Sequence, residues 1–295
     1  MGITAGGVME PSVAVRLRVV LIVGLPLAAF SVASVELARG SLVLGIAVLV
    51  IALIGSASTS TYLVRRTERL KAALISTLSH ELRTPLTSIR GALCMLRADA
   101  HPASRQTLID LAYRNSERLT RLVEDLLDLQ RLELGCLVLN REEIALGDVI
   151  VESIETHREV AASRRVEIVV SEIPDVCIEA DAARLIQVVS YLLSNALKYS
   201  PAGSGVELDV TATERRVTLA VTNHGPPIPA SFRKQVFMRF TQADSSDRRL
   251  HGGAGLGLAL AREIVELHGG TIGCRSDDLG TTFSFELPRL RRSAA

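Results

Sequence analysis

The chain has 295 residues, which is room for more than one soluble domain, because such domains commonly hold about 100 to 150 residues. Its 33 Lys and Arg residues nearly balance its 32 Asp and Glu residues, so the even charge excludes the basic surface expected of direct nucleic-acid binding. Apolar residues make up 48% of the chain but aromatic residues only 3%, a composition typical of long aliphatic helices and membrane spans.

Two uncharged stretches near the N-terminus predict a transmembrane helical hairpin. One lies between Arg18 and Glu36 and the other runs from Ser41 to Val64. At roughly 1.5 Å per residue, the first almost spans a hydrocarbon core and the second is longer. Only Glu36 to Gly40 separates them, which excludes a sizeable extracellular domain. We therefore interpret residues 1–67 as a membrane hairpin with two transmembrane helices.

The basic residues around this hairpin predict its orientation. They precede the first stretch and follow the second: Arg16, Arg18, Arg65, Arg66, Arg69 and Lys71. Positive residues favour the cytoplasmic side, so we expect a multi-pass protein of the cell membrane with both termini in the cytoplasm. The alternative reading of the first stretch is a cleaved signal peptide, in which case the second stretch would still be an anchor.

Residues 68–135 predict two amphipathic helices that form a hairpin. Apolar residues recur at three- and four-residue spacing from Glu68 to about Ala98 and again from Ser104 to Leu134. Pro102 bars the first helix from continuing. Such a hairpin leaves an apolar seam exposed, which a second copy of the chain could bury. We therefore expect a homodimer with a four-helix bundle.

His80 in the first of these helices is a candidate nucleophile. It follows the apolar position Leu78 by two residues, which turns its side chain away from the bundle axis and toward solvent. An imidazole with a pKa near 6.5 is largely neutral at pH 7 and keeps a lone pair for attack. Glu81 can accept the proton of the other ring nitrogen, and Thr84 lies one turn beyond His80.

The run Ser79-His80-Glu81-Leu82-Arg83-Thr84-Pro85-Leu86 resembles the phosphoacceptor box of bacterial two-component sensor histidine kinases. The resemblance implies that His80 is autophosphorylated and that Glu81 assists as a base. It also implies that Glu81 and Thr84 help in phosphotransfer to a response regulator and in its dephosphorylation.

After Gly135 the pattern changes to alternating strands and helices, which predicts an α/β two-layer sandwich over residues 136–290. Strands are expected at 166–170, 206–211, 217–221 and 281–287, and helices at 181–200, capped by Asp181, and at 256–267. The run Gly252 to Leu258 is rich in glycine and opens the last helix. Its backbone N–H groups could hold a phosphate, and a P-loop sequence is absent.

Five boxes in order resemble the ATP-binding domain of histidine kinases, which shares its fold with gyrase-type and chaperone ATPases. They are 192–200, 223–229, 237–240, 252–258 and 280–283. The resemblance implies ATP and Mg²⁺ as cofactors, with Asn195 holding the metal and residues Thr241 to Gly253 forming a lid. The remaining nucleotide-binding residues that it implies are Lys198, Tyr199, Asn223, Gly225, Gly253, Gly255, Leu256, Gly257 and Thr282.

Three positions depart from the family pattern. Asn223 replaces an aspartate that accepts a hydrogen bond from adenine, and a neutral acceptor should lower affinity about five-fold. Pro227 replaces a common glycine. Tyr191 replaces a second asparagine near the phosphates, where its phenol could partly substitute as a donor.

The sequence thus predicts a sensor histidine kinase. No receiver domain follows the tail Arg289 to Ala295, so we expect the phosphoryl group to pass to an aspartate of a separate, cytoplasmic response regulator with a receiver domain. One alternative is a catalytically weak ATP-binding regulatory scaffold or phosphatase, because Asn223 and Tyr191 could mark decay of kinase chemistry. The other is a conformational ATPase of the gyrase or chaperone kind, in which the His80 box would have no role.

Overall fold

The computed structural model describes residues 42–98, 102–241 and 255–290. The chain divides into two compact units, Met1–Ser76 and Thr77–Ala295. The first predicted transmembrane stretch lies outside the described residues, and the second coincides with the beginning of helix α3 (Leu42–Arg97). Within the described ranges, no helix is long and apolar enough to cross a membrane.

The region around His80 is a pair of antiparallel helices, as predicted. Helix α3 includes His80 and Pro85, and helix α4 (Pro102–Glu133) begins at the proline expected to stop its predecessor. Ala92 of α3 and Leu122 and Leu129 of α4 are buried, whereas several large apolar side chains of the hairpin are exposed in the single chain. The exposed ones include Leu86, Leu93, Met95, Ile109, Leu111 and Leu127.

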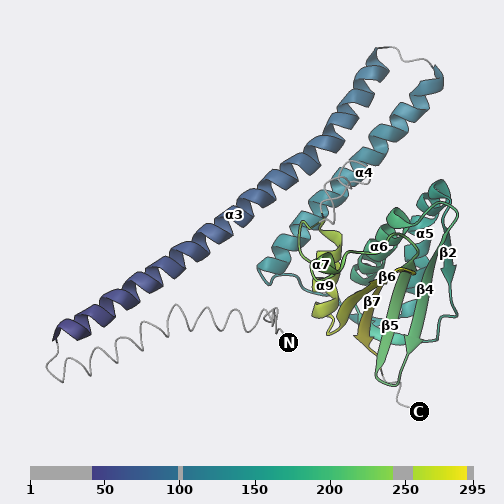
Figure 1. Cartoon of the computed structure of the whole chain (residues 1–295). Coiled ribbons are helices and arrows are strands. Elements are labelled where there is room, and N and C mark those ends of the chain that lie inside the picture. Colours follow the sequence, from purple (N-terminus) through teal and green to yellow (C-terminus); the bar gives the residue numbers. More distant parts are fainter. Residues whose placement is uncertain (1–41, 99–101, 242–254, 291–295) are drawn as a thin grey trace. The chain divides into compact units, whose positions relative to one another are not determined.

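The described residues from Glu142 to Pro288 form an α/β domain with one sheet covered by helices (Figure 1). Its five-stranded sheet has the order β2-β4-β5-β7-β6, in which only the β2–β4 pair is parallel, and β1 and β3 form a separate antiparallel pair. The elements are β1 (Glu142–Ala145), α5 (Leu146–Arg164), β2 (Glu167–Val170), β3 (Cys177–Ala180), α6 (Ala182–Tyr199), β4 (Gly205–Ala212), β5 (Arg216–Asn223), α7 (Ala230–Arg233), α9 (Gly257–Leu267), β6 (Thr271–Asp277) and β7 (Gly280–Pro288).

The core of this domain lies between the sheet and helices α5, α6 and α9. Strands alternate between buried and exposed side chains, so that Val206, Leu208 and Val210 of β4 all face the helices. Helix α6 begins after Asp181, whose carboxylate accepts a hydrogen bond from the Arg184 N–H at 3.1 Å. The predicted two-layer sandwich and the predicted cap are therefore confirmed.

A buried histidine in α5 gives the domain a pH-dependent stability. The ring of His157 donates through Nδ1 to the Ser153 carbonyl oxygen at 2.8 Å, and burial lowers its pKa below the ordinary value. Burial also lowers the pKa of His268 below the ordinary value. Because the unfolded chain then binds protons first, the free energy of unfolding should fall as pH drops below about 6.5.

Urea unfolding of the full chain at pH 7.5 and at pH 5.5 measures this effect. In His157→Gln the loss of stability between the two pH values should be smaller than in the parent, with the remainder due in part to His268. An equal loss in parent and variant would show that His157 does not contribute.

Candidate functional site

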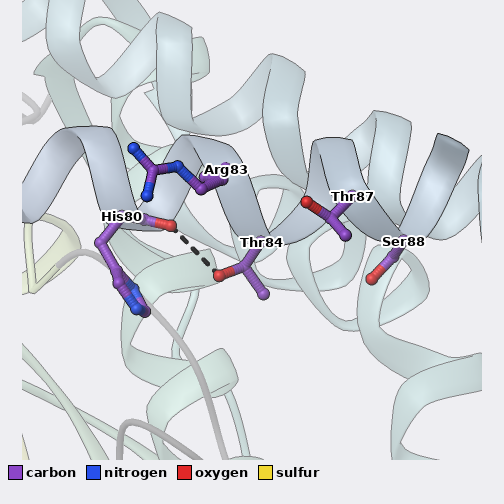
Figure 2. Close-up of a pocket in the computed structure, with 5 residues that line it drawn as sticks. All are labelled: His80, Arg83, Thr84, Thr87 and Ser88. Carbon is purple, nitrogen blue, oxygen red and sulfur yellow. Dashed lines mark hydrogen bonds between the residues drawn. The ribbon is translucent and has the colours of Figure 1, made fainter. Parts of the chain in front are cut away.

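His80 is exposed on α3, as its spacing from Leu78 predicts. It lines a hollow of about 370 Å³ together with Arg83, Thr84, Thr87 and Ser88 of the same helix. Figure 2 shows these five side chains. The Thr84 hydroxyl donates to the His80 carbonyl oxygen at 3.1 Å, which fixes this threonine one turn along the helix. The nucleophile is therefore open to an incoming phosphoryl donor or acceptor.

Glu81 follows His80 directly, so its side chain points to a different side of α3 from that of His80, and it is buried. Its carboxylate accepts a hydrogen bond from Arg118 Nη2 of α4 at 3.1 Å, and the two side chains form an ion pair. The carboxylate expected to take the proton of His80 is thus held by α4 in this arrangement. To act as the base it must exchange Arg118 for the imidazole.

The end of α6 carries three of the predicted nucleotide-binding residues. Asn195, Lys198 and Tyr199 are all partly buried. The Lys198 ammonium lies 4.7 Å from the centre of the Tyr199 ring, where the cation is attracted to the ring face. One turn separates Asn195 from this pair, so α6 presents an amide and a cation side by side.

The structure brings this end of α6 next to the residues that follow β5. Asn223 is buried, and its amide nitrogen donates to the Thr281 carbonyl oxygen at 3.2 Å while its oxygen accepts from the Gly225 N–H at 3.0 Å. A Cβ on Gly225 would clash with the Tyr199 carbonyl oxygen. The hydroxyls of Thr222 on β5 and of Thr282 on the neighbouring strand β7 are 2.9 Å apart. Pro227 is exposed.

These two bonds require a side chain that both donates and accepts, as an amide does. An aspartate there would put a carboxylate oxygen against the Thr281 carbonyl oxygen, so Asn223→Asp should lower the free energy of unfolding by about 1 to 3 kcal/mol. It should also bind ATP about five-fold more tightly, since a charged acceptor forms the stronger bond with an amino group. Urea unfolding and titration with MgADP measure the two effects.

The half-buried Asn115 of α4 offers a matched control for this change, because its amide nitrogen donates to the Leu111 carbonyl oxygen at 2.8 Å. Asn115→Asp should leave nucleotide affinity unchanged. Equal affinities of the parent and Asn223→Asp would contradict a contact between residue 223 and the base.

The glycine-rich loop is described from Gly255 onward, and Gly253 and lid residues 242–253 lie outside the described residues. Gly255 has a φ of 67°, and its carbonyl oxygen accepts from the Phe240 N–H at 2.9 Å. Gly257 begins α9. The side chain of Leu256 is buried in an apolar cluster with Leu122, Leu129 and Leu260, so only its backbone could contribute to nucleotide binding.

The Tyr191 hydroxyl, expected as a donor near the phosphates, is directed toward α4. It donates a hydrogen bond to the Asp125 carboxylate of α4 and accepts one from Gln187 Nε2 at 3.1 Å. Burial raises the pKa of Asp125 to about 6 and raises the pKa of Tyr191. Sequence reasoning missed this contact; the available signal was the aspartate pair at positions 125 and 128, one turn apart in a leucine-rich helix.

Comparison with known proteins places this geometry in a family. Residues 70–135 match the His Kinase A (phospho-acceptor) domain, and residues 180–291 match the histidine kinase-, DNA gyrase B- and HSP90-like ATPase domain. The two matches together span more than half of the chain. The chain belongs to the two-component sensor histidine kinases.

Individual relatives agree with this assignment. The chain is 36% identical to the sensor histidine kinase WalK of Bacillus subtilis (strain 168) over 224 residues, which are 72% of this chain and 36% of the relative. The histidine kinase ThkA, solved in complex with the response regulator protein TrrA, has a TM-score of 0.56 at 26% identity, over 77% of this chain and 65% of that chain. Full-length ShkA, solved with AMPPNP, has a TM-score of 0.55 at 28% identity, over 74% of this chain and 46% of that chain.

The chain spans under half the length of the curated relatives that it matches, from 15% to 44%. The two family matches, over residues 70–135 and 180–291, include His80 and the end of α6.

Proposed function

We propose that this histidine kinase phosphorylates His80 from ATP and passes the phosphoryl group to an aspartate of a separate response regulator. The exposed imidazole of His80 carries the proposal, because it stands in the phosphoacceptor domain of a chain that also holds the ATPase-type domain. One ring nitrogen attacks the γ-phosphorus, the bond from that phosphorus to the bridging oxygen breaks, and ADP leaves. The proton of the other ring nitrogen passes to Glu81 once this carboxylate leaves Arg118.

The nucleotide would lie between the end of α6, the residues after β5 and the glycine loop. Lys198 supplies positive charge, Asn223 accepts from the adenine amino group, and the backbone from Gly255 to Gly257 approaches the phosphates. Mg²⁺ keeps several waters and needs few protein ligands, so the single amide oxygen of Asn195 fits it. When bound, the ion would balance phosphate charge.

The partners we propose are a second copy of the chain and a response regulator. The apolar side chains that the hairpin leaves exposed, such as Leu86, Leu93 and Leu127, would be covered in a four-helix bundle of two copies. ThkA, which shares this fold, was solved with its response regulator. The hollow beside His80 is open for the aspartate of such a partner, with Thr84 at its edge.

We also propose that residues 1–67 anchor the chain in the cell membrane with both termini in the cytoplasm. The support comes from the sequence: two uncharged stretches, with six basic residues on their outer sides and one, Arg39, between them. Fractionation of cells that make the full chain tests this, and recovery in the soluble fraction would contradict it.

The test of the kinase proposal is incubation of the full chain, in detergent micelles, with γ-labelled ATP and Mg²⁺. We expect a label that is stable to base and lost in acid, as a phosphohistidine is, and that moves to an added response regulator. A chain that binds MgADP and acquires no label would instead support the regulatory scaffold or phosphatase, which the Glu81–Arg118 ion pair and the Asn223 and Tyr191 departures favour.

A further inference from the structure

Helix α6 of the ATP-binding domain contacts α4 through three polar side chains on one face. Arg184 binds the Asp128 carboxylate with two guanidinium nitrogens, one of them at 3.0 Å. Gln187 Nε2 donates to the same carboxylate at 3.1 Å and to the Tyr191 hydroxyl oxygen at 3.1 Å. The Tyr191 hydroxyl in turn donates to Asp125. Residues three and four apart on α6 thus meet residues three apart on α4.

Apolar side chains shield this polar contact from water. Leu122 and Leu129 of α4 and Leu256 and Leu260 at the beginning of α9 form a buried cluster, against which Tyr191 packs. The raised pKa of Asp125 has burial as its main cause, which agrees with a carboxylate removed from water. A hydrogen bond to a carboxylate in such surroundings is stronger than one at the surface.

The Tyr191 ring also lies against the backbone of the first turn of α9. A Cβ on Gly257 would lie 2.6 Å from Cδ1 of the ring and 3.1 Å from Cγ and Cε1, so the glycine backbone rests directly on the ring. Asn195 follows Tyr191 by one turn of α6. One side chain therefore touches α4 at its hydroxyl and the glycine loop at its ring.

We propose that Tyr191 is a positioning residue, which couples docking of the ATP-binding domain on α4 to the affinity of the glycine loop for nucleotide. The proposal rests on the proposed function, since it takes the nucleotide to bind at Gly255 to Gly257. The bond to Asp125 fixes the angle of the ring, and the ring fixes the backbone at Gly257, where N–H groups would meet phosphate. Because coupling between two binding events is reciprocal, nucleotide should strengthen docking on α4 as much as docking strengthens nucleotide binding.

Calorimetric titration of the full chain with MgADP, in detergent micelles, tests the first half of this coupling. Tyr191→Phe keeps the ring on Gly257 and removes the hydroxyl, whereas Asp125→Ala removes the acceptor on α4 and leaves the ATP-binding domain intact. Each should bind MgADP about five-fold more weakly than the parent, and the double variant no more weakly than either single one. In autophosphorylation the KM for ATP should rise by the same factor while the rate at saturating ATP changes less than two-fold.

Two variants on α4 serve as matched controls. Tyr113 is exposed, and Asp110 accepts from Gln106 Nε2 at 2.8 Å on the outer surface. Tyr113→Phe and Asp110→Ala remove the same chemical groups as the contact variants and should leave MgADP affinity unchanged. If the parent binds MgADP and both contact variants bind it within two-fold of the parent, the coupling is refuted while the proposed function stands. A parent that binds no nucleotide refutes both.

Hydrogen exchange tests the second half. Addition of MgADP to the parent should slow amide exchange in residues 122–132 of α4, and should do so less in Tyr191→Phe. A purely structural role for the phenol would lower stability in the variant without changing this response to nucleotide. An equal response in parent and Tyr191→Phe would overturn the proposal.

Discussion

Replacement of His80 by alanine is expected to abolish incorporation of label from γ-labelled ATP, a loss of at least about 10³-fold, because the lone pair that attacks phosphorus is removed. Affinity for MgADP should be unchanged, since His80 is an exposed side chain of α3 and the described residues that line its hollow all belong to α3. The measurement is label retained on the full chain after base treatment, with nucleotide binding measured on the same preparation.

Glu81→Gln is the informative companion to this variant. It keeps the size of the side chain and one acceptor for Arg118 but cannot take a proton, so the rate of labelling should fall by about 10² to 10⁴ while His80 remains the acceptor. Label that persists on His80→Ala would place the phosphoryl acceptor elsewhere in the chain. Unchanged labelling in Glu81→Gln would remove Glu81 as the base.

Gly225→Ala should have the second largest effect. Gly225 is buried between α6 and β5, and a methyl group there would clash with the Tyr199 carbonyl oxygen and lie 2.9 Å from the side-chain oxygen of Asn223. Backbone cannot rotate away as a flexible side chain can, so the end of α6 must shift. We expect the free energy of unfolding to fall by about 1 to 3 kcal/mol and MgADP affinity to fall at least about ten-fold.

Gly273 on β6 provides the matched control for this glycine. A Cβ added there meets nothing within 4 Å, so Gly273→Ala should change neither stability nor affinity appreciably. Urea unfolding and MgADP titration of the full chain measure both variants. Normal nucleotide affinity in Gly225→Ala would separate this turn from the binding site.

The sequence by itself determined the elements whose periodicity is strong. Apolar spacing predicted both hairpin helices, and it predicted α6 and α9 because their apolar residues fall on one helical face. Alternation predicted β4, β5 and β7. The phosphoacceptor and nucleotide boxes were readable because each is a local run of residues, and the exposure of His80 followed from its distance to Leu78.

Other elements carried too little local signal to be predicted. Strands β1 and β3 have only four residues each and pair with one another across helix α5, so no short window of sequence contains the pair. Helix α5 and strand β6 were not predicted either, because the pattern of apolar and polar residues is weak in both.

Only the tertiary structure decided where the polar groups of the site are directed. Glu81 binds Arg118, 37 positions away, and Tyr191 binds Asp125, 66 positions away. Asn223 finds its partners at Gly225 and Thr281 because β5 and β7 are neighbours in the sheet. Periodicity assigns a side chain to a face of its own helix or strand, but a hydrogen bond depends on distance and angle between two elements, and packing alone fixes these.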